Sequence, residues 1–171
     1  MSARTTFPSA AGASVLANPW WIAGIAVVGL FAVLFPTYRS MIEIWMRSDT
    51  FAHGFLIVPI CIWLVWRQRD ELADINPKVA PIGLLAAALL SFVWLLGNLA
   101  DIIVVQQLAA TVLVPAVVWA VLGTDVLRVL AFPLGYLIFA VPFGEVLIQP
   151  LMEFTASFTV KAVQLTGIPI Y

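Results

Sequence analysis

The feature that most constrains this sequence is a succession of long apolar runs with almost no charge inside them. Of 171 residues, 63% are hydrophobic and only 10% are charged, whereas a soluble domain carries about 25% charged residues. Such a chain cannot cover a surface that faces water. It suits a bilayer, where side chains that face lipid must be apolar. The sequence therefore predicts an integral membrane protein whose surroundings are the lipid bilayer.

Five of these runs are candidates for membrane-spanning helices. They predict an all-α fold, a polytopic transmembrane helical bundle. A span needs roughly 17–25 apolar residues, so the first, second and fifth runs are short. Only Asp101 and its neighbours separate the third run from the fourth, which predicts a tight helical hairpin. The five runs cover residues 20–35, 51–66, 81–99, 102–122 and 126–141.

A sixth segment, residues 145–165, is amphipathic rather than uniformly apolar. Polar residues recur in it at spacings of four and then three, which places them in one stripe of a helix. Such a helix either lies in the membrane interface or spans the membrane as a sixth helix with its stripe packed into the bundle. We expect the interfacial arrangement, at the outer face. The stripe consists of Glu145, Gln149, Glu153, Ser157, Lys161 and Gln164.

The distribution of basic residues predicts which way the bundle faces. Short loops on the cytoplasmic side carry the excess of Lys and Arg. A cytoplasmic N-terminus places Arg39 and Arg47 outside and the larger group inside, with Ser40 and Phe143 extracytoplasmic and Asp74 cytoplasmic. We therefore expect a flexible cytoplasmic N-terminus (residues 1–18), a retained first helix, and one transmembrane domain (residues 19–171). The inside group is Arg4, Arg67, Arg69, Lys78 and Arg128.

Three residues are candidates for supporting a site: Asp49, His53 and Glu153. Asp49 and His53 are four residues apart at the mouth of the second predicted span, where the carboxylate would orient the imidazole ring. The alternative is a helix cap, with Ser48, Asp49 or Thr50 at the N-cap and His53 merely interfacial. Glu153 is either a functional intramembrane charge or one member of the interfacial stripe.

Other chemistries lack the residues they need. One His and one Cys provide no metal-ligand spacing, and the sequence has no glycine-rich phosphate loop, so we expect no metal or cofactor. The net charge of −1 does not favour nucleic acid as a partner. Cys61 is set in an apolar run, about 12 Å by helical rise from His53, so we expect it to be structural. Gln106 and Gln107 are expected to form hydrogen bonds to a neighbouring helix. Gly54 is expected to let another helix approach closely.

Two stretches of the sequence resemble the signatures of bacterial exosortases, and the exosortase A subgroup in particular. The first signature segment is TFAHGFLIVPICIWLVWRQRDEL, residues 50–72. The second, residues 128–171, contains an F-P-x-x-x-L-x-F-x-V-P core and closes on L-x-G-I-P-x-Y. With the hydrophobic layout between them, the resemblance covers roughly residues 38–171.

The resemblance implies a multi-pass cysteine enzyme of the bacterial inner membrane. Its family processes proteins that bear a short C-terminal PEP-CTERM sorting tail, by a sortase-like cleavage and transfer, and is associated with exopolysaccharide production. The family's catalytic Cys, in a C-S-G context, and its Arg and His follow the G-I-P-x-Y motif. No C-S-G occurs here, so none of these roles transfers to a residue of this sequence.

The expectation that follows is the scaffold part of an exosortase, truncated before the active site and inactive alone. Two alternatives stay open on the sequence. One is a small membrane transporter, with broken helices at Pro115, Pro133 and Pro142 lining a path. The other is a non-catalytic subunit of a membrane assembly. The sequence does not indicate the oligomeric state.

Overall fold

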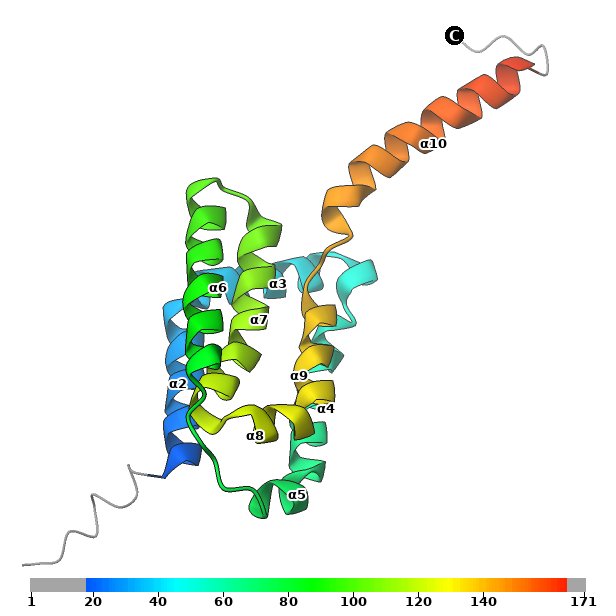
Figure 1. Ribbon diagram of the computed structural model, residues 1–171. Helices are drawn as coiled ribbons and strands as arrows, with labels where there is room; N and C mark the ends of the chain where they lie inside the picture. Colours follow the sequence, from blue (N-terminus) through cyan, green and yellow to red (C-terminus); the bar gives the residue numbers. More distant parts are fainter. Residues whose placement is uncertain (1–17, 166–171) are drawn as a thin grey trace, which may run out of the picture.

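The computed structural model describes residues 18–165, apart from the side chains of residues 145–147. Residues 1–17 of the predicted N-terminal segment and most of the closing L-x-G-I-P-x-Y motif lie outside this range. Within it the chain forms helices and no strand (Figure 1), which confirms an all-α membrane fold. The elements are α2 (Pro19–Val33), α3 (Phe35–Arg47), the 3-10 helix η1 (Asp49–Phe51), α4 (Gly54–Arg67), α5 (Arg69–Ala73), α6 (Pro81–Leu99), α7 (Ile103–Leu122), α8 (Thr124–Val129), α9 (Ala131–Tyr136), the 3-10 helix η2 (Leu137–Ala140) and α10 (Glu145–Leu165).

The predicted hairpin is confirmed as the antiparallel pair α6 and α7. Pro81 begins α6, where its missing N–H costs nothing. The turn between the helices places Asp101 at a positive φ of 54°, a conformation that Asp tolerates better than most residues. The amide of Ile102 then donates to the carbonyl of Gly97 over 2.9 Å. The side chain of Gln106 donates to the same carbonyl over 3.3 Å, as expected of a glutamine that bonds to a neighbouring helix.

Small residues let the two helices of the hairpin approach closely. A Cβ built on Gly83 would lie 2.8 Å from the Cα of Ala120, and one on Gly97 would lie 2.9 Å from a methyl group of Val105. In lipid no hydrophobic driving force brings helices together, so close packing at small residues has to stabilise the pair. The hairpin forms the centre of the bundle, because α7 also packs against α2, α3 and η2.

The number of continuous spans is smaller than the sequence predicted. Within residues 18–165, three helices are long and apolar enough to cross a membrane: Asp49–Arg67, Pro81–Leu99 and Ile103–Leu122. The pair α2 and α3 qualifies only when taken together, and it bends by 72°. The described chain therefore has three spans, or four if the bent pair is one of them.

The expected fifth span, residues 126–141, is not one helix. The chain there divides into α8, α9 and η2, with breaks at Leu130 and at the start of the 3-10 turn. The apolar piece Ala131–Ala140 has 10 residues, which rise about 15 Å as an α-helix, half the thickness of the hydrocarbon core. The prediction of a single span is therefore wrong, although the apolar run is present and Pro133 lies in its interrupted part.

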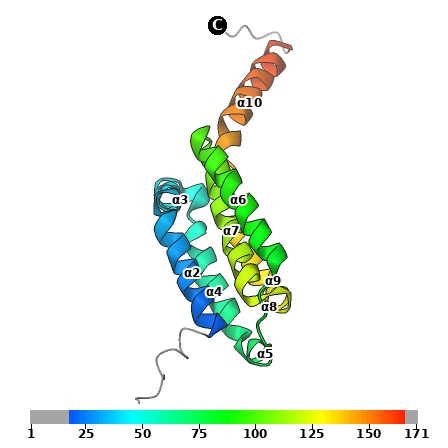
Figure 2. The same ribbon diagram turned by 60° about the vertical axis from the view of Figure 1, so that its left-hand side comes forward.

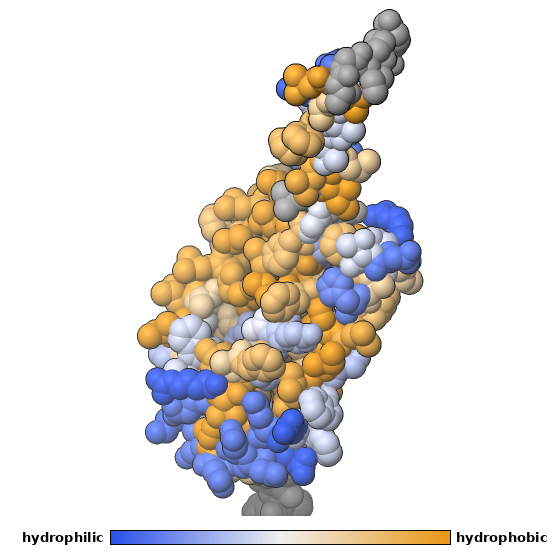
Figure 3. Space-filling model, turned by 90° about the vertical axis from the view of Figure 1, so that its right-hand side faces the viewer, coloured by the Kyte–Doolittle hydropathy of each residue, from blue (hydrophilic) through white to orange (hydrophobic). Residues whose placement is uncertain are grey.

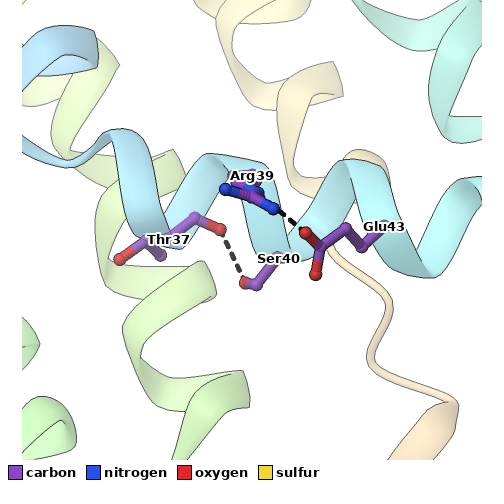
Figure 4. Close-up of polar contacts among 4 residues, drawn as sticks. All are labelled: Thr37, Arg39, Ser40 and Glu43. Atoms are coloured by element: carbon purple, nitrogen blue, oxygen red, sulfur yellow. Dashed lines mark hydrogen bonds and ion pairs between the residues drawn. The ribbon is translucent and has the colours of Figure 1, made fainter.

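The segment between the first and second predicted spans is also a helix. At Leu34 the chain turns, and α3 runs across the bundle, so that Figure 2 shows it nearly end-on beside the lengthwise α2. One face of α3 is buried against the bundle and carries Met41, Ile44 and Trp45. The opposite face carries Arg39 and Glu43, joined by an ion pair of 2.8 Å (Figure 4). A helix with this division of faces suits the boundary between a membrane and water.

A chain of polar contacts fixes α3 to the hairpin. The Gln107 amide donates to the Ser40 hydroxyl over 3.0 Å, and Ser40 donates to the carbonyl of Thr37 over 2.7 Å. The Trp94 indole donates to the Thr37 hydroxyl over 3.1 Å. Gln107 thus bonds across to a neighbouring helix as predicted. Each such bond contributes about 0.6 kcal/mol in membrane proteins, so together they hold α3 across the bundle.

Helix α10 extends away from the bundle (Figure 1), and its bounds agree with the amphipathic segment that the sequence predicted. Figure 3 shows hydrophobic atoms along it beside hydrophilic ones. Its large apolar side chains are uncovered, with Phe154 69% and Phe158 64% exposed. Outside a membrane such a surface is costly, at about 25 cal/mol per Å². The exposure is consistent with a helix that contacts lipid. The placement of α10 flat in the interface rather than across the membrane stays a prediction.

A reporter fused after Tyr171 distinguishes the two placements of α10. We expect alkaline phosphatase at that position to be active in the periplasm, because a flat or re-entrant helix at the outer face returns the chain to that side. This placement also avoids burying Glu153 and Lys161, each at roughly 2.5–3.5 kcal/mol at mid-bilayer. A reporter that is active only in the cytoplasm would mean that α10 spans.

Candidate functional site

The structure brings the two signature segments together near one end of the bundle. The indole Nε1 of Trp45 donates to the carbonyl of Ala140 over 2.9 Å, which joins α3 to the second segment. Trp45 also packs against Gly54 of the first segment. We call Trp45, Phe51, Gly54, Ala140 and Gly144 the signature junction.

Glycines permit the close contacts of the signature junction. A Cβ on Gly54 would overlap the indole ring of Trp45, and one on Gly144 would lie 3.1 Å from the Phe51 ring. The prediction that Gly54 admits another helix is thus confirmed, and the helix is α3. A buried cluster continues the contact inward through Met41, Ile44, Ile57, Cys61 and Val141.

Asp49 and His53 lie beside the signature junction, and both side chains are exposed. In the described part of the chain no hydrogen bond or ion pair joins them. Instead, Nδ1 of His53 lies 3.0 Å from the carbonyl of Thr50. A carbonyl only accepts, so Nδ1 of His53 is the donor in this contact. The backbone therefore orients the His53 ring in the way that Asp49 was expected to do.

The alternative prediction, that these residues cap a helix, agrees with the structure in the positions of the residues but not in their hydrogen bonds. Ser48 occupies the N-cap of η1 and His53 the N-cap of α4, and neither side chain makes a capping bond. The exposed side chains of Asp49 and His53 thus do not bond to each other, and His53 bonds instead to the Thr50 carbonyl of η1. They remain candidates for contact with a substrate or with another part of the protein.

Glu153 lies apart from these residues, on the protruding α10. Its carboxylate accepts a hydrogen bond from the Gln149 amide over 2.9 Å, one turn earlier in the same stripe. Arg128 pairs instead with Asp125 over 3.2 Å in α8. The described contact of Glu153 is thus with its own helix.

Cys61 is buried in α4 within the same cluster as Met41 and Trp45. Its neighbours there are apolar or aromatic, and none is a general base that would generate a thiolate. Among residues 18–165, no group of three His, Cys, Asp or Glu side chains is placed to hold a metal ion. The described site therefore contains polar groups that can bind or orient, and no assembled nucleophile.

Sequence reasoning missed Trp45 and Ala140, which join the two segments. Trp45 lies between the first and second predicted spans, and Ala140 lies within the fifth. A signal was present, because Tyr38, Met41, Ile42 and Trp45 recur at helical spacing. The spacing identifies α3 as a helix with a buried face, but it does not identify Ala140 as its partner, because 95 residues separate the two.

The fold and the signature junction together define a polytopic, all-helical membrane protein with exposed polar side chains near one end of its bundle. The family model of the transmembrane exosortases matches residues 45–171, from Trp45 onward. The chain belongs to the transmembrane exosortase family. No curated protein and no solved structure matches it.

Proposed function

We propose that this chain is the membrane part of an exosortase that processes exported proteins at a C-terminal PEP-CTERM tail, in a pathway linked to exopolysaccharide production. The observation that carries the proposal is the signature junction, where both segments that resemble the family meet beside exposed polar groups. The family match over residues 45–171 supports it. The transporter alternative has less support, because residues 126–141 carry only Arg128 and Tyr136 as polar side chains.

The chemistry that the resemblance implies is thiol acyl transfer. A cysteine thiolate attacks the scissile carbonyl carbon and forms a thioester, while the amine of the released tail takes up a proton. An acceptor nucleophile then attacks the thioester and regenerates the thiolate. An arginine stabilises the oxyanion that forms in both steps. In the family these groups follow the L-x-G-I-P-x-Y motif, so we assign the catalytic roles to no residue of this sequence.

The residues present would orient the substrate rather than react with it. Asp49 and His53 lie exposed where the two segments meet, and Glu153 lies on the helix that leaves this end. We infer that they support the site by holding the incoming tail. The test is a strain that lacks the gene, complemented with it, in which processing of a PEP-CTERM-tailed protein is followed by its loss of mass. Asp49→Asn and His53→Gln are compared with Asp74→Asn at the opposite end.

The expected result is that complementation restores processing and that both site variants slow it by about 100-fold, the lower end of the range for loss of a positioning or acid–base group. Asp74→Asn leaves the rate unchanged. Failure of the native gene to restore processing would overturn the proposed function. Equal rates for all three variants would overturn only the roles of Asp49 and His53.

A second expectation concerns Cys61, which we predict is dispensable. Expressed from the native gene, Cys61→Ser should process the tailed substrate at the native rate within about twofold, because the side chain is packed among apolar groups and serine preserves its size. Immunoblots of the membrane fraction control for protein level. Complete loss of processing at a normal protein level would show that this thiol takes part.

The orientation belongs to the same proposal. Figure 1 shows α5 and α8 at one end of the bundle and α3 toward the other. Arg67, Arg69 and Arg128 thereby lie at the end opposite Arg39. Figure 3 shows hydrophilic atoms gathered at the end with α5, below a mainly hydrophobic middle. With more basic residues at that end, we infer that it faces the cytoplasm of a bacterium's inner membrane and that the signature junction faces outward.

Single cysteines test this orientation in a Cys61→Ser background. A cysteine at Thr50 or Phe143 is expected to react with a membrane-impermeant maleimide in intact cells, and one at Asp74 only after lysis. Thr50 is preferred to Ser40 because the Ser40 hydroxyl is engaged by Gln107. External labelling at position 74 equal to that at position 50 would reverse the assignment.

A further inference from the structure

An apolar pocket of about 470 Å³ lies under α3, between the bend that joins α2 to α3 and the first half of α4. Its rim is exposed, and includes Phe35 at 58% and Val58 at 39%. Its floor is buried and includes Met41, Trp45 and Ala140. The pocket is therefore open at the side of the bundle and closed by α3 and η2.

The polar atoms that line the pocket are already bonded within the protein. The Tyr38 hydroxyl donates to the carbonyl of Ala110 over 2.8 Å, and the Thr111 hydroxyl donates to the carbonyl of Gln107 over 2.8 Å. The Trp45 indole donates to Ala140. A polar ligand would lose its hydration there and gain no partner, which is costly. The lining thus favours a hydrocarbon.

The pocket suits a hydrocarbon chain in its dimensions. One turn of an α-helix of 10–12 Å diameter and 5.4 Å pitch fills about 420–610 Å³, so a helix lying against the open side would place only the side chains of about one turn in a pocket of about 470 Å³. An extended acyl chain is narrow enough to enter from the side and lie along the floor.

An arginine lies next to the rim. Arg39 is one turn from Phe35 and from Ile42, both of which line the pocket, and it projects on the polar face of α3. Its Nε donates to Glu43, which fixes the guanidinium and balances its charge in the absence of a ligand. The guanidinium nitrogens that this bond does not use match the oxygens of a phosphate. Hydrocarbon pocket and guanidinium thus stand in the order in which a phospholipid presents its chain and its headgroup.

We propose that this pocket binds one phospholipid, with an acyl chain against Trp45 and Ala140 and the phosphate beside Arg39. The lipid would fill the space under α3 and support the floor that Trp45 and Ala140 form at the signature junction. This site is separate from the polar groups that are proposed to meet the substrate, so its test does not depend on the exosortase reaction.

Native mass spectrometry of the full chain in detergent tests the proposal with phosphatidylglycerol as the probe. One retained lipid per protein is expected. Each methylene kept out of an apolar site lowers affinity about fourfold, so Val58→Phe, which fills the rim, is expected to lower retention by about tenfold. The control is Val93→Phe on α6, since Val93 is similarly exposed, 42% against 39%, and lies outside the pocket.

The headgroup contact has its own pair of variants. Arg39→Gln is expected to lower retention by about threefold, the effect of one exposed charge contact. Arg128→Gln, which removes another exposed arginine that is paired within its own helix, should not change retention. If Val58→Phe does not elute as a folded protein, Ile42→Phe enters the same pocket from α3.

Two results would overturn the proposal. One is equal retention by the Val58→Phe and Val93→Phe proteins, which would mean that the lipid binds the general apolar surface. The other is a Val58→Phe protein that retains the lipid as well as the native protein does but no longer binds a twenty-residue polyleucine helix that the native protein binds. That result would make a helix the occupant of the pocket.

Discussion

Replacing Trp45 with alanine is expected to lower the free energy of unfolding by about 3 kcal/mol, and to abolish processing by the native-gene protein. The indole is 9% exposed, covers Gly54 and donates to Ala140. Its removal leaves a cavity where the two signature segments meet. Losses for Trp→Ala run from about 3 to 5 kcal/mol, and the lower figure applies because lipid, not water, receives part of the exposed surface.

Two further variants separate the hydrogen bond of Trp45 from its packing. Trp45→Phe keeps most of the ring and loses the bond to Ala140, so it should lose about 1 kcal/mol. Trp21→Ala removes an indole that is 58% exposed on α2 and should change stability by less than about 0.5 kcal/mol. Unfolding in mixed micelles, followed by circular dichroism, provides the comparison. A loss for Trp21→Ala as large as that for Trp45→Ala would contradict the assignment.

Gly83→Ala is expected to lower the free energy of unfolding by about 2–3 kcal/mol, although it adds only one methyl group. That methyl group would lie 2.5 Å from the backbone nitrogen of Ala120 and 2.8 Å from its Cα. Backbone atoms cannot rotate away, so α6 and α7 must separate along their contact. Overpacking of this kind costs about 1–3 kcal/mol.

The same substitution at two other glycines provides a comparison for the loss of stability expected at Gly83. At Gly97 the nearest atom is a side-chain methyl group of Val105, which can shift, so Gly97→Ala should lose less. At Gly24 nothing lies within 4 Å, and alanine there should gain about 0.5–1 kcal/mol because it favours the helix. Helix propensity alone predicts a gain at all three positions. An increase in stability for Gly83→Ala would show that the close approach of the helices is not maintained.

Much of the helical layout could be predicted because apolar length and spacing are local properties. The α6–α7 hairpin and the bounds of α10 follow from runs of residues that also contact one another locally. Glycine and glutamine were interpreted correctly for a similar reason. In lipid, small residues mark close contacts, and amides need partners.

Two elements were predicted wrongly because mean hydropathy does not report helix breaks. Residues 126–141 are mainly apolar, yet they divide into α8, α9 and η2, where Pro133 and the 3-10 turn interrupt the ladder of helical hydrogen bonds. Helix α3 was hidden for the opposite reason, since Arg39, Glu43 and Arg47 lower its average while its buried face keeps helical period.

The site was located only in outline by the sequence. Asp49 and His53 are four residues apart, a spacing that predicts a pair on an α-helix. The backbone at Asp49 forms a 3-10 turn instead, and the Thr50 carbonyl, not Asp49, contacts the His53 ring. The residues that join the two segments are remote in sequence, so no local pattern could connect them.

The bond between Trp45 and Ala140 also fixes an order of assembly. Its two partners are 95 residues apart, so during synthesis from the N-terminus α3 and α4 are made long before η2 exists. The hairpin α6–α7 lies between them in sequence and closes through its own neighbouring contacts, which are the fast kind to form. The hairpin therefore provides the template on which the late contact closes. In a pulse-labelled chain, protection of α6 and α7 should precede protection of α3.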